Sequence, residues 1–231
     1  SLMRRAAAEC DVVATTIFVN PLQFAATEDL STYPRDLDGD SHLAEACGVA
    51  HLFVPDEAEM YPDGRDGVQT TVHVGGPSVG LEGASRPTHF DGVATVVAKL
   101  FGIAGAGRAY FGEKDWQQLL VVRRLAHDLS LPIEVIGCPI VREDDGLAMS
   151  SRNVRLTSEQ RAAAVVLHRA LLAGRADPAD PEGAMRAVVA TEPLADLDYV
   201  ATRDGRLLIA ARFGSVRLID NLSLEPTCAA E

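Results

Sequence analysis

The chain has 231 residues, of which 47% are hydrophobic, and a formal net charge of −12. This length can bury the core of one large domain or of two modest ones. The negative charge argues against nucleic-acid binding but is compatible with a local cationic pocket for a small anion. No apolar run approaches the roughly 20 residues of a membrane span, so we expect no membrane partner. The scattered cysteines, Cys10, Cys47, Cys138 and Cys228, favour reduced thiols in a cytoplasmic protein.

Strand and helix patterns alternate over the first 141 residues. This alternation predicts an α/β fold with a parallel sheet and helices on both faces. The helix that begins at Trp116 is expected to bury Leu119, Val122, Ala126 and Leu129, by its helical spacing. The expected elements in chain order are a helix over 1–8, a strand buried on both faces over 12–19, a loop over 22–35, a weak helix over 36–47, a strand over 51–55, an extended segment over 68–74, a glycine-rich loop over 75–92, a helix over 93–104, a buried strand over 109–111, a helix from 116 and a strand over 133–136.

The character of the sequence changes near residues 141–153, and we place a domain boundary between 1–141 and 142–231. The run Thr-Ser-Glu-Gln at 157–160 is a capping-box pattern that opens a helix to about residue 173. A proline- and aspartate-rich loop over 176–182 is followed by three β-rich runs. Helices followed by strands predict a smaller α+β domain with an antiparallel sheet.

One strand-to-helix junction stands out, with the sequence Tyr-Phe-Gly-Glu-Lys-Asp-Trp-Gln-Gln. Gly112 would let a ligand approach the backbone, and Asp115 is a natural N-cap. Lys114 lies where the N-terminus of a helix already attracts anions, and Gln117 and Gln118 can both donate and accept hydrogen bonds. Ligands of open α/β sheets bind beyond the carboxyl ends of the strands. The junction is therefore either a phosphate or carboxylate site or a surface turn with a solvated lysine.

A second candidate is the run Met149, Ser150, Ser151 and Arg152, which precedes the capped helix. Two hydroxyls and a guanidinium can hold the oxygens of a triphosphate. Serine-rich loops are common, so the run is a weak signal by itself. Together with a Gly-Glu-Lys-Asp turn it predicts a nucleotide clamp.

Other catalytic motifs are absent from the sequence. It contains no dinucleotide-binding glycine motif after a strand, no P-loop and no G-x-S-x-G elbow. The six histidines are dispersed, without the spacing of a zinc site. His127 and His168 fall within helix patterns, and we interpret both as structural.

Six stretches of the chain, taken in order, resemble the signature stretches of one enzyme family. They are Ile-Phe-Val-Asn-Pro-Leu-Gln-Phe at 17–24, Tyr-Pro-Arg at 33–35, Arg-Pro-Thr-His-Phe at 86–90, Tyr-Phe-Gly-Glu-Lys-Asp-Trp-Gln-Gln at 110–118, Asp-Gly-Leu-Ala-Met-Ser-Ser-Arg-Asn at 145–153 and Leu-Ile-Asp-Asn at 218–221. The family is that of the pantothenate synthetases, or pantoate–β-alanine ligases. Because the resemblance covers essentially the whole chain and three of the motifs are long, it is highly specific.

The resemblance implies a Rossmann-like nucleotidyltransferase domain over 1–141, a smaller C-terminal α+β domain over 142–231 and a homodimer. It implies a reaction in which ATP and Mg²⁺ are used to adenylate pantoate, with release of pyrophosphate. β-Alanine then attacks the pantoyl adenylate to give pantothenate and AMP. The implied ligands are pantoate, β-alanine and ATP, together with Mg²⁺, whose protein ligands are left open.

Carried over by motif, Gln23 and Gln118 would bind pantoate or β-alanine. Lys114 would contact the phosphates and Asp115 the ribose of ATP, and Lys114, Ser150, Ser151 and Arg152 would be catalytic. Attack of a carboxylate on a phosphate brings negative charges together, so catalysis would rest on positioning and on cationic stabilisation. The full ATP site implied by the resemblance is Gly112, Glu113, Lys114, Asp115, Val141, Met149, Ser150, Ser151 and Arg152.

The chain departs from the family pattern at its start. The family opens with a strand and a Met-Gly-x-Leu-His-x-Gly-His stretch that binds ATP, and we expect this chain to lack that strand and the histidine pair. Gly39 between Asp38 and Asp40 also leaves a magnesium role there open. Two alternatives follow: a non-catalytic or impaired chain that only binds ligand, and an adenylyltransferase that acts on another carboxylic acid.

Overall fold

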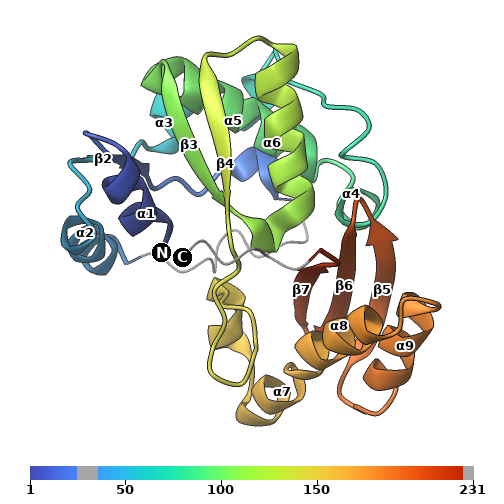
Figure 1. Cartoon of the computed structure of the whole chain (residues 1–231). Coiled ribbons are helices and arrows are strands. Elements are labelled where there is room, and N and C mark those ends of the chain that lie inside the picture. The colour runs from blue at the N-terminus through green and yellow to red at the C-terminus, as the bar shows by residue number, and fades with distance from the viewer. Residues whose placement is uncertain (25–35, 226–231) are drawn as a thin grey trace. The chain divides into compact units, whose positions relative to one another are not determined.

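The computed structural model describes residues 1–24 and 36–225. The chain divides into two compact units, Ser1–Cys138 and Pro139–Glu231, against an expected boundary at 141/142 (Figure 1). The Tyr-Pro-Arg motif at 33–35 and Cys228 lie outside the described residues. Within the described ranges, no helix has the length and apolarity needed to cross a membrane.

The first unit contains two parallel β-ladders. In one, Ala14 pairs with His51, and in the other Gly107 pairs with Ile133. The elements are α1 (Leu2–Glu9), β1 (Ala14–Thr16), η1 (Pro21–Gln23), α2 (Leu37–Ala46), β2 (His51–Phe53), α3 (Glu57–Met60), η3 (Arg65–Gly67), α4 (Glu82–Ser85), α5 (His89–Ala104), β3 (Gly107–Gly112), η4 (Glu113–Asp115), α6 (Trp116–Asp128) and β4 (Ile133–Cys138). The expected α/β class with parallel pairing is confirmed. Among the described residues, however, β1–β2 and β3–β4 are separate two-stranded sheets rather than one.

The core of the first unit lies between α5, α6 and the strands beside them. α5 buries Val93, Val96 and Val97 at the expected helical spacing. α6 buries Leu119 and Val122 as expected, but Leu129 is 52% exposed. The expectation for Leu129 is wrong because α6 ends at Asp128 and the chain turns away at its C-cap.

The strands of this unit are shorter and less buried than expected. β1 has three residues instead of the eight expected over 12–19, and Val12 is exposed. Its partner β2 stops just before Val54 and Pro55, and proline cannot donate to a ladder, which limits the pairing. β3 is half-buried rather than buried, and the segment over 68–74 forms no strand.

The expected loop over 75–92 is partly helical. It contains the short helix α4, and α5 begins at His89 rather than at Val93. The side chain of Gln117 orders this segment from far along the chain, since it accepts a hydrogen bond from the backbone N–H of Glu82. A local sequence pattern cannot include a partner 35 residues away.

The second unit is an α+β domain, as expected. Its elements are η5 (Ser151–Arg155), α7 (Ser158–Ala163), α8 (Val166–Ala176), α9 (Pro181–Val189), β5 (Asp196–Arg203), β6 (Arg206–Phe213) and β7 (Val216–Ser223). The three strands form an antiparallel sheet in the order β5-β6-β7. Its core joins α8 and α9 to the sheet and includes Leu167, Leu171, Met185, Leu207 and Ile209.

Two helix boundaries in this unit differ from expectation. The capping box at Thr157 and Gln160 is present, with both hydrogen bonds made. The helix that it opens is interrupted after Ala163, because Leu167 donates to the carbonyl of Ala164 in a tighter, 3₁₀-type turn. The expected loop over 176–182 already includes the first turn of α9, which begins at Pro181.

Candidate active site

The strand-to-helix junction forms as expected, with one exception. β3 ends at Gly112, and the single turn η4 leads directly into α6. The side chain of Lys114 is only 16% exposed, and its Nζ lies 3.5 Å from Oδ1 of Asp115. Asp115 occupies the N-cap position but its side chain makes no capping hydrogen bond, so that part of the expectation is wrong. Its carboxylate pairs with the lysine instead of with the first turn of α6.

The chain itself does not require a glycine at position 112. Gly112 has a φ of −71°, which any residue can adopt. A Cβ built there would meet no heavy atom within 4 Å. Space is therefore open beside the backbone at the end of β3, and a close approach by a ligand stays the prediction for this glycine.

Gln117 and Gln118 are neighbours in the first turn of α6 but differ in their surroundings. The amide of Gln117 is buried, and its Nε2 lies within hydrogen-bond distance of the carbonyls of Pro77 (2.8 Å), Val79 (3.4 Å) and Gly80 (3.1 Å). Gln118 is half-buried, and its side chain forms no hydrogen bond with any residue in the described ranges. Of the two, Gln118 alone has an amide that a ligand could use without breaking an internal bond.

The buried side chain of Asn20 holds Gln23 in place. Its Nδ2 donates to Oε1 of Gln23 (3.2 Å) and to the carbonyl of Gly92 (3.1 Å). Its Oδ1 accepts from the hydroxyl of Tyr61 (2.8 Å) and from the backbone N–H of Leu22 (3.3 Å). Burial raises the pKa of Tyr61 to about 12, so the phenol remains a donor at neutral pH. Asn20 thus ties η1 to α5 and to the residue that follows α3.

Residues at and just before the start of α5 also hold η1 in place. Arg86 donates to the carbonyl of Gln23 (3.3 Å), and Nδ1 of His89 lies 3.0 Å from the same oxygen. A Cβ at Gly92 would lie 2.3 Å from the carbonyl oxygen of Leu22, so α5 can pack directly against η1 only with glycine there. The backbone and side chain of Gln23 are therefore fixed before any ligand binds.

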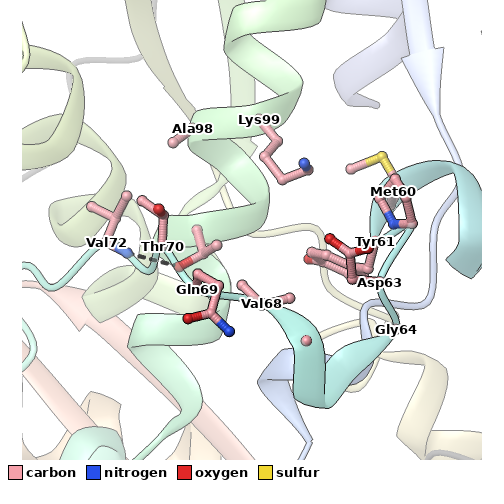
Figure 2. Close-up of a pocket in the computed structure, with 13 residues that line it drawn as sticks. Met60, Tyr61, Asp63, Gly64, Val68, Gln69, Thr70, Val72, Ala98 and Lys99 are labelled. Carbon is pink, nitrogen blue, oxygen red and sulfur yellow. Dashed lines mark hydrogen bonds between the residues drawn. The ribbon is translucent and has the colours of Figure 1, made fainter.

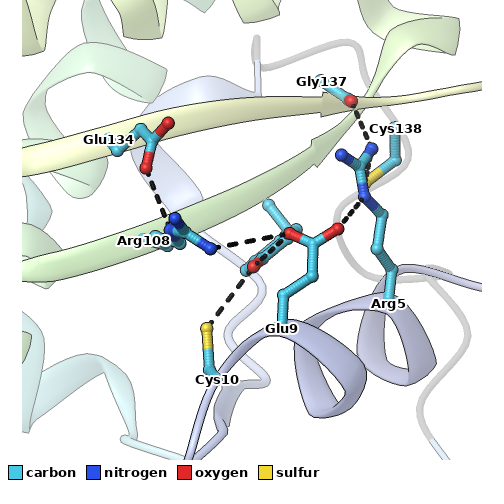
Figure 3. A network of polar contacts seen from close by, with 8 residues as sticks. Arg5, Glu9, Cys10, Arg108, Glu134, Gly137 and Cys138 are labelled. Atoms are coloured by element: carbon cyan, nitrogen blue, oxygen red, sulfur yellow. Dashed lines mark hydrogen bonds and ion pairs between the residues drawn. The ribbon is translucent and has the colours of Figure 1, made fainter.

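A polar network joins α1 to β3 and β4 (Figure 3). The carboxylate of Glu9 accepts from Arg5 (2.8 Å) and from the hydroxyl of Tyr110 (2.9 Å), and both bonds lower the pKa of Glu9. Arg5 also donates to the carbonyl of Gly137 (2.9 Å). Arg108 pairs with Glu134 across the β3–β4 ladder (2.9 Å). The network holds β3 along the part that leads to Gly112.

In the second unit, an ion pair closes the loop that carries the serine run. Arg142 donates to both carboxylate oxygens of Asp220 on β7, at 2.7 and 3.0 Å, and to the carbonyl of Gly146 (3.0 Å). The side chain of Asp220 is 1% exposed and that of Arg142 is 18% exposed. Arg142 also forms a β-bridge with Ala148, directly before the serine run. The Leu-Ile-Asp-Asn motif therefore has an internal structural role.

The serine run itself presents polar groups. Ser150 caps η5, with its Oγ accepting from the backbone N–H of Arg152 (3.2 Å). The guanidinium of Arg152 forms no hydrogen bond or ion pair with the described residues. Val141, Met149 and Ser151 are exposed. The part of the predicted ATP site that belongs to the second unit therefore lies largely at the surface of that unit.

Sequence reasoning missed several residues that shape the site. Asn20, Tyr61 and Arg142 all act through partners that lie far along the chain. Gln117 was expected to form hydrogen bonds, but not with the distant carbonyls that it contacts. The signal available for Asn20 was its position before a proline at the end of the expected strand.

The two histidines interpreted as structural have different surroundings. The side chain of His127 is largely exposed, whereas Nδ1 of His168 is buried without a hydrogen-bond partner in the described part of the chain.

The described residues contain no ready-made metal centre. Among residues 1–24 and 36–225, no three His, Cys, Asp or Glu side chains are close enough together to hold a metal ion. Magnesium is usually bound through one or two carboxylates and the phosphates of the substrate, which does not require such a cluster.

Comparison with known proteins identifies the family. The family model described as pantoate–β-alanine ligase matches residues 1–223. The chain is 54% identical to a pantothenate synthetase of Roseiflexus sp. strain RS-1, over 97% of this chain and 87% of the relative. It is 52% identical to the pantothenate synthetase of Deinococcus radiodurans, over 97% and 88%.

Solved structures agree with these matches. The pantothenate synthetase of Thermus thermophilus is 48% identical, with a TM-score of 0.91 over 97% of this chain and 88% of that one. The pantoate–β-alanine ligase of Francisella tularensis, complexed with an ATP compound and β-alanine, is 35% identical, with a TM-score of 0.85 over 97% and 84%. The fold class and the ligase activity expected from the resemblance are confirmed. The chain therefore belongs to the pantoate–β-alanine ligase family.

Proposed function

We propose that this chain condenses pantoate with β-alanine at the expense of ATP, through a pantoyl adenylate, and that its two units divide the work. The first unit, with Gln23, Gln118 and the Gly112–Asp115 turn, would bind pantoate and part of ATP. The second would supply Val141 and the Met149–Arg152 run. The family match over residues 1–223 supports the reaction, and the contrast between Gln117 and Gln118 supports the assignment of the acid-binding amide.

In the first step, a carboxylate oxygen of pantoate attacks the α-phosphorus of ATP. The bond between that phosphorus and the bridging oxygen breaks, and pyrophosphate leaves with the electron pair. Both reactants are anionic, so the residues needed are cations that stabilise the phosphates. Lys114 and Arg152 are the cations that the carried-over motifs provide, and the hydroxyls of Ser150 and Ser151 would add donors without adding charge.

In the second step, the amine of β-alanine attacks the acyl carbon of the pantoyl adenylate. A C–N bond forms, the amine loses a proton, and AMP leaves with the electrons of the acyl C–O bond. Gln23 and Gln118 would orient the pantoyl group for this attack through its hydroxyls, because an amide can pair with both donors and acceptors. The fixed position of Gln23 under Asn20, Arg86 and His89 suits that role.

Mg²⁺ would enter with the triphosphate, since the described residues hold no three-ligand cluster and substrate phosphates commonly complete its coordination. When bound, it supplies positive charge to the phosphates. We also propose that the protein works in the cytoplasm as a homodimer; the thiols of Cys10, Cys47 and Cys138 are free, as a reducing compartment would keep them.

The test is pantoate-dependent exchange of pyrophosphate into ATP, followed by formation of AMP when β-alanine is added. We expect exchange that requires pantoate, and AMP formation that requires both pantoate and β-alanine. Lys114→Ala should lower kcat/KM about 10²–10³-fold, the usual cost of one transition-state donor. Arg124→Gln, an exposed cation paired with Asp128 on α6, serves as the control and should leave it unchanged.

Gln118→Ala tests the acid-binding role. It should raise the KM for pantoate about tenfold or more, with little change in the KM for ATP, because one ligand hydrogen bond is removed. An unchanged pantoate KM would refute the assignment.

The exchange assay also separates the two alternative functions. A chain that only binds ligand would bind pantoate in calorimetry but would not exchange pyrophosphate into ATP. An adenylyltransferase for another acid would exchange pyrophosphate in the presence of that acid in preference to pantoate.

A further inference from the structure

The helix α4 is hydrogen-bonded to both of the segments that carry the amides assigned to pantoate, Gln23 on η1 and Gln118 on α6. At its first residue, the backbone N–H of Glu82 donates to Oε1 of Gln117 on α6 (3.0 Å). At its C-cap, the guanidinium of Arg86 donates to the carbonyl of Gln23 (3.3 Å). The backbone N–H of Arg86 also donates to the carbonyl of Glu82 (2.8 Å), so a single helical turn joins the two contacts.

The amide of Gln117 also holds the turn that precedes α4. Its Nε2 lies 2.8 Å from the carbonyl of Pro77 and 3.1 Å from that of Gly80. The carbonyl of Gly80 in addition accepts the turn hydrogen bond from the backbone N–H of Gly83 (2.9 Å). Gln117 is 4% exposed, and carbonyls face its NH₂ group while a backbone N–H faces its oxygen, so only one orientation of the amide satisfies its neighbours.

Leu81, inside this turn, has a strained backbone. Its φ of 50° and ψ of −121° are those of the first central residue of a type II′ turn, a position that glycine dominates. A leucine keeps such a conformation only where the surrounding contacts hold it. Gln117 bonds to the backbone on both sides of Leu81, at the carbonyl of Gly80 and at the N–H of Glu82. Without that amide, Leu81 would favour a different turn, and the start of α4 would move.

We propose that Gln117 is a positioning residue for the ligase reaction. By fixing α4, it sets the place of Gln23 relative to Gln118, its own neighbour on α6. This inference rests on the proposed function for the role of the two amides. Both amides reach one small acid only at one spacing, so a displaced α4 weakens the binding of pantoate. The contacts proposed for ATP, at Lys114 and at the serine run, do not depend on α4.

The kinetic test uses Gln117→Met, which keeps the length of the side chain but removes the amide. The KM for pantoate should rise about tenfold or more, and the KM for ATP should stay within about twofold. The double variant Gln117→Met/Leu81→Gly should bring the pantoate KM back to within about threefold of the unmodified chain, because glycine adopts the turn without support. An unchanged pantoate KM in Gln117→Met, or a rise that Leu81→Gly does not reverse, would overturn the proposal.

Thr95→Val is the matched control for the loss of a buried hydrogen bond. Thr95 is buried on α5, and its hydroxyl accepts from the backbone N–H of Val72 (2.9 Å), a bond drawn in Figure 2. It lines a cavity of about 480 Å³ that none of the residues proposed to bind substrate lines. The pantoate KM of Thr95→Val should therefore stay within about twofold of the unmodified chain. Equal rises in Thr95→Val and Gln117→Met would reduce the role of Gln117 to general stability and contradict the proposal.

Amide hydrogen exchange, followed by NMR without substrates, tests the link between α4 and η1 independently of activity. In Gln117→Met the backbone N–H of Glu82, which loses its acceptor, and that of Gln23 should both exchange about tenfold faster or more. Thr95→Val should accelerate exchange at Val72 and not at Gln23. Unchanged exchange at Gln23 in Gln117→Met would refute the link even in an active ligase. If the unmodified chain gives no pantoate-dependent pyrophosphate exchange, the proposed function fails, and with it the role of Gln117 in the reaction, while hydrogen exchange still decides the link.

Discussion

Replacement of Asp220 by asparagine tests how the serine-bearing loop is held. The change keeps the size of the side chain but removes the charge that pairs with the two terminal guanidinium nitrogens of Arg142, at 2.7 and 3.0 Å. Asp220 is 1% exposed and Arg142 18% exposed, so water has little access to the position of the lost carboxylate. Arg142 would retain its bond to the carbonyl of Gly146.

The size of the effect follows from this burial. Breaking a buried ion pair from one side costs about 3–5 kcal/mol, and because the asparagine still accepts one hydrogen bond we expect about 3 kcal/mol. Asp198→Asn is the matched control on the same sheet. Its carboxylate lies 2.8 Å from Arg217 but is 32% exposed, and a solvent-accessible pair is worth about 0–1 kcal/mol.

The assay is urea unfolding followed by far-ultraviolet circular dichroism, with both variants compared with the unmodified chain. With a slope of about 1–3 kcal/mol per molar urea, Asp220→Asn should lower the midpoint by roughly 1–3 M, and Asp198→Asn by much less. The KM for ATP should also rise in Asp220→Asn, because Arg142 begins the loop that leads to the serine run. Equal losses of stability in the two variants would refute the reasoning from burial.

Two further predictions concern packing and pH. Gly92→Ala should destabilise the protein by at least 1–3 kcal/mol, because its Cβ would lie 2.3 Å from a backbone carbonyl oxygen. In Gly102→Ala, a variant of the same helix, the new Cβ meets no atom, and the change should stabilise the protein by up to about 1 kcal/mol. Thermal unfolding compares the two variants, and equal effects would contradict the close approach at Gly92. Burial holds the pKa of His168 below its usual 6.5, so the unfolded chain binds a proton at this histidine more readily than the folded chain does. The stability that the neutral ring contributes is therefore complete above pH 6.5 and is lost as the pH falls through the lowered pKa. His168→Gln should flatten the acid side of the stability profile, measured by urea unfolding over a series of pH values, and an unchanged profile would contradict the effect of burial.

The sequence by itself determined the features that depend on neighbouring residues. The capping box at Thr157 and Gln160 and the turn between β3 and α6 need only contacts within a few positions, and both formed where expected. The order of the longer helices and of the strands followed from hydrophobic periodicity for the same reason, whereas the short helices α3 and α4 were not expected and the segment over 68–74 formed no strand. The motifs at 110–118 and 145–153 were long enough to indicate the family by their residues alone.

Only the tertiary structure decided how neighbouring residues with the same chemistry divide their tasks. Gln117 and Gln118 are alike in sequence, but a rotation of about 100° per residue in a helix turns one into the core and the other away from it. Asn20 reaches Tyr61 across 41 residues, and Arg142 reaches Asp220 across 78. Such partners are chosen by the packing of distant segments, because a buried polar group must find whichever hydrogen-bond partner the fold brings to it.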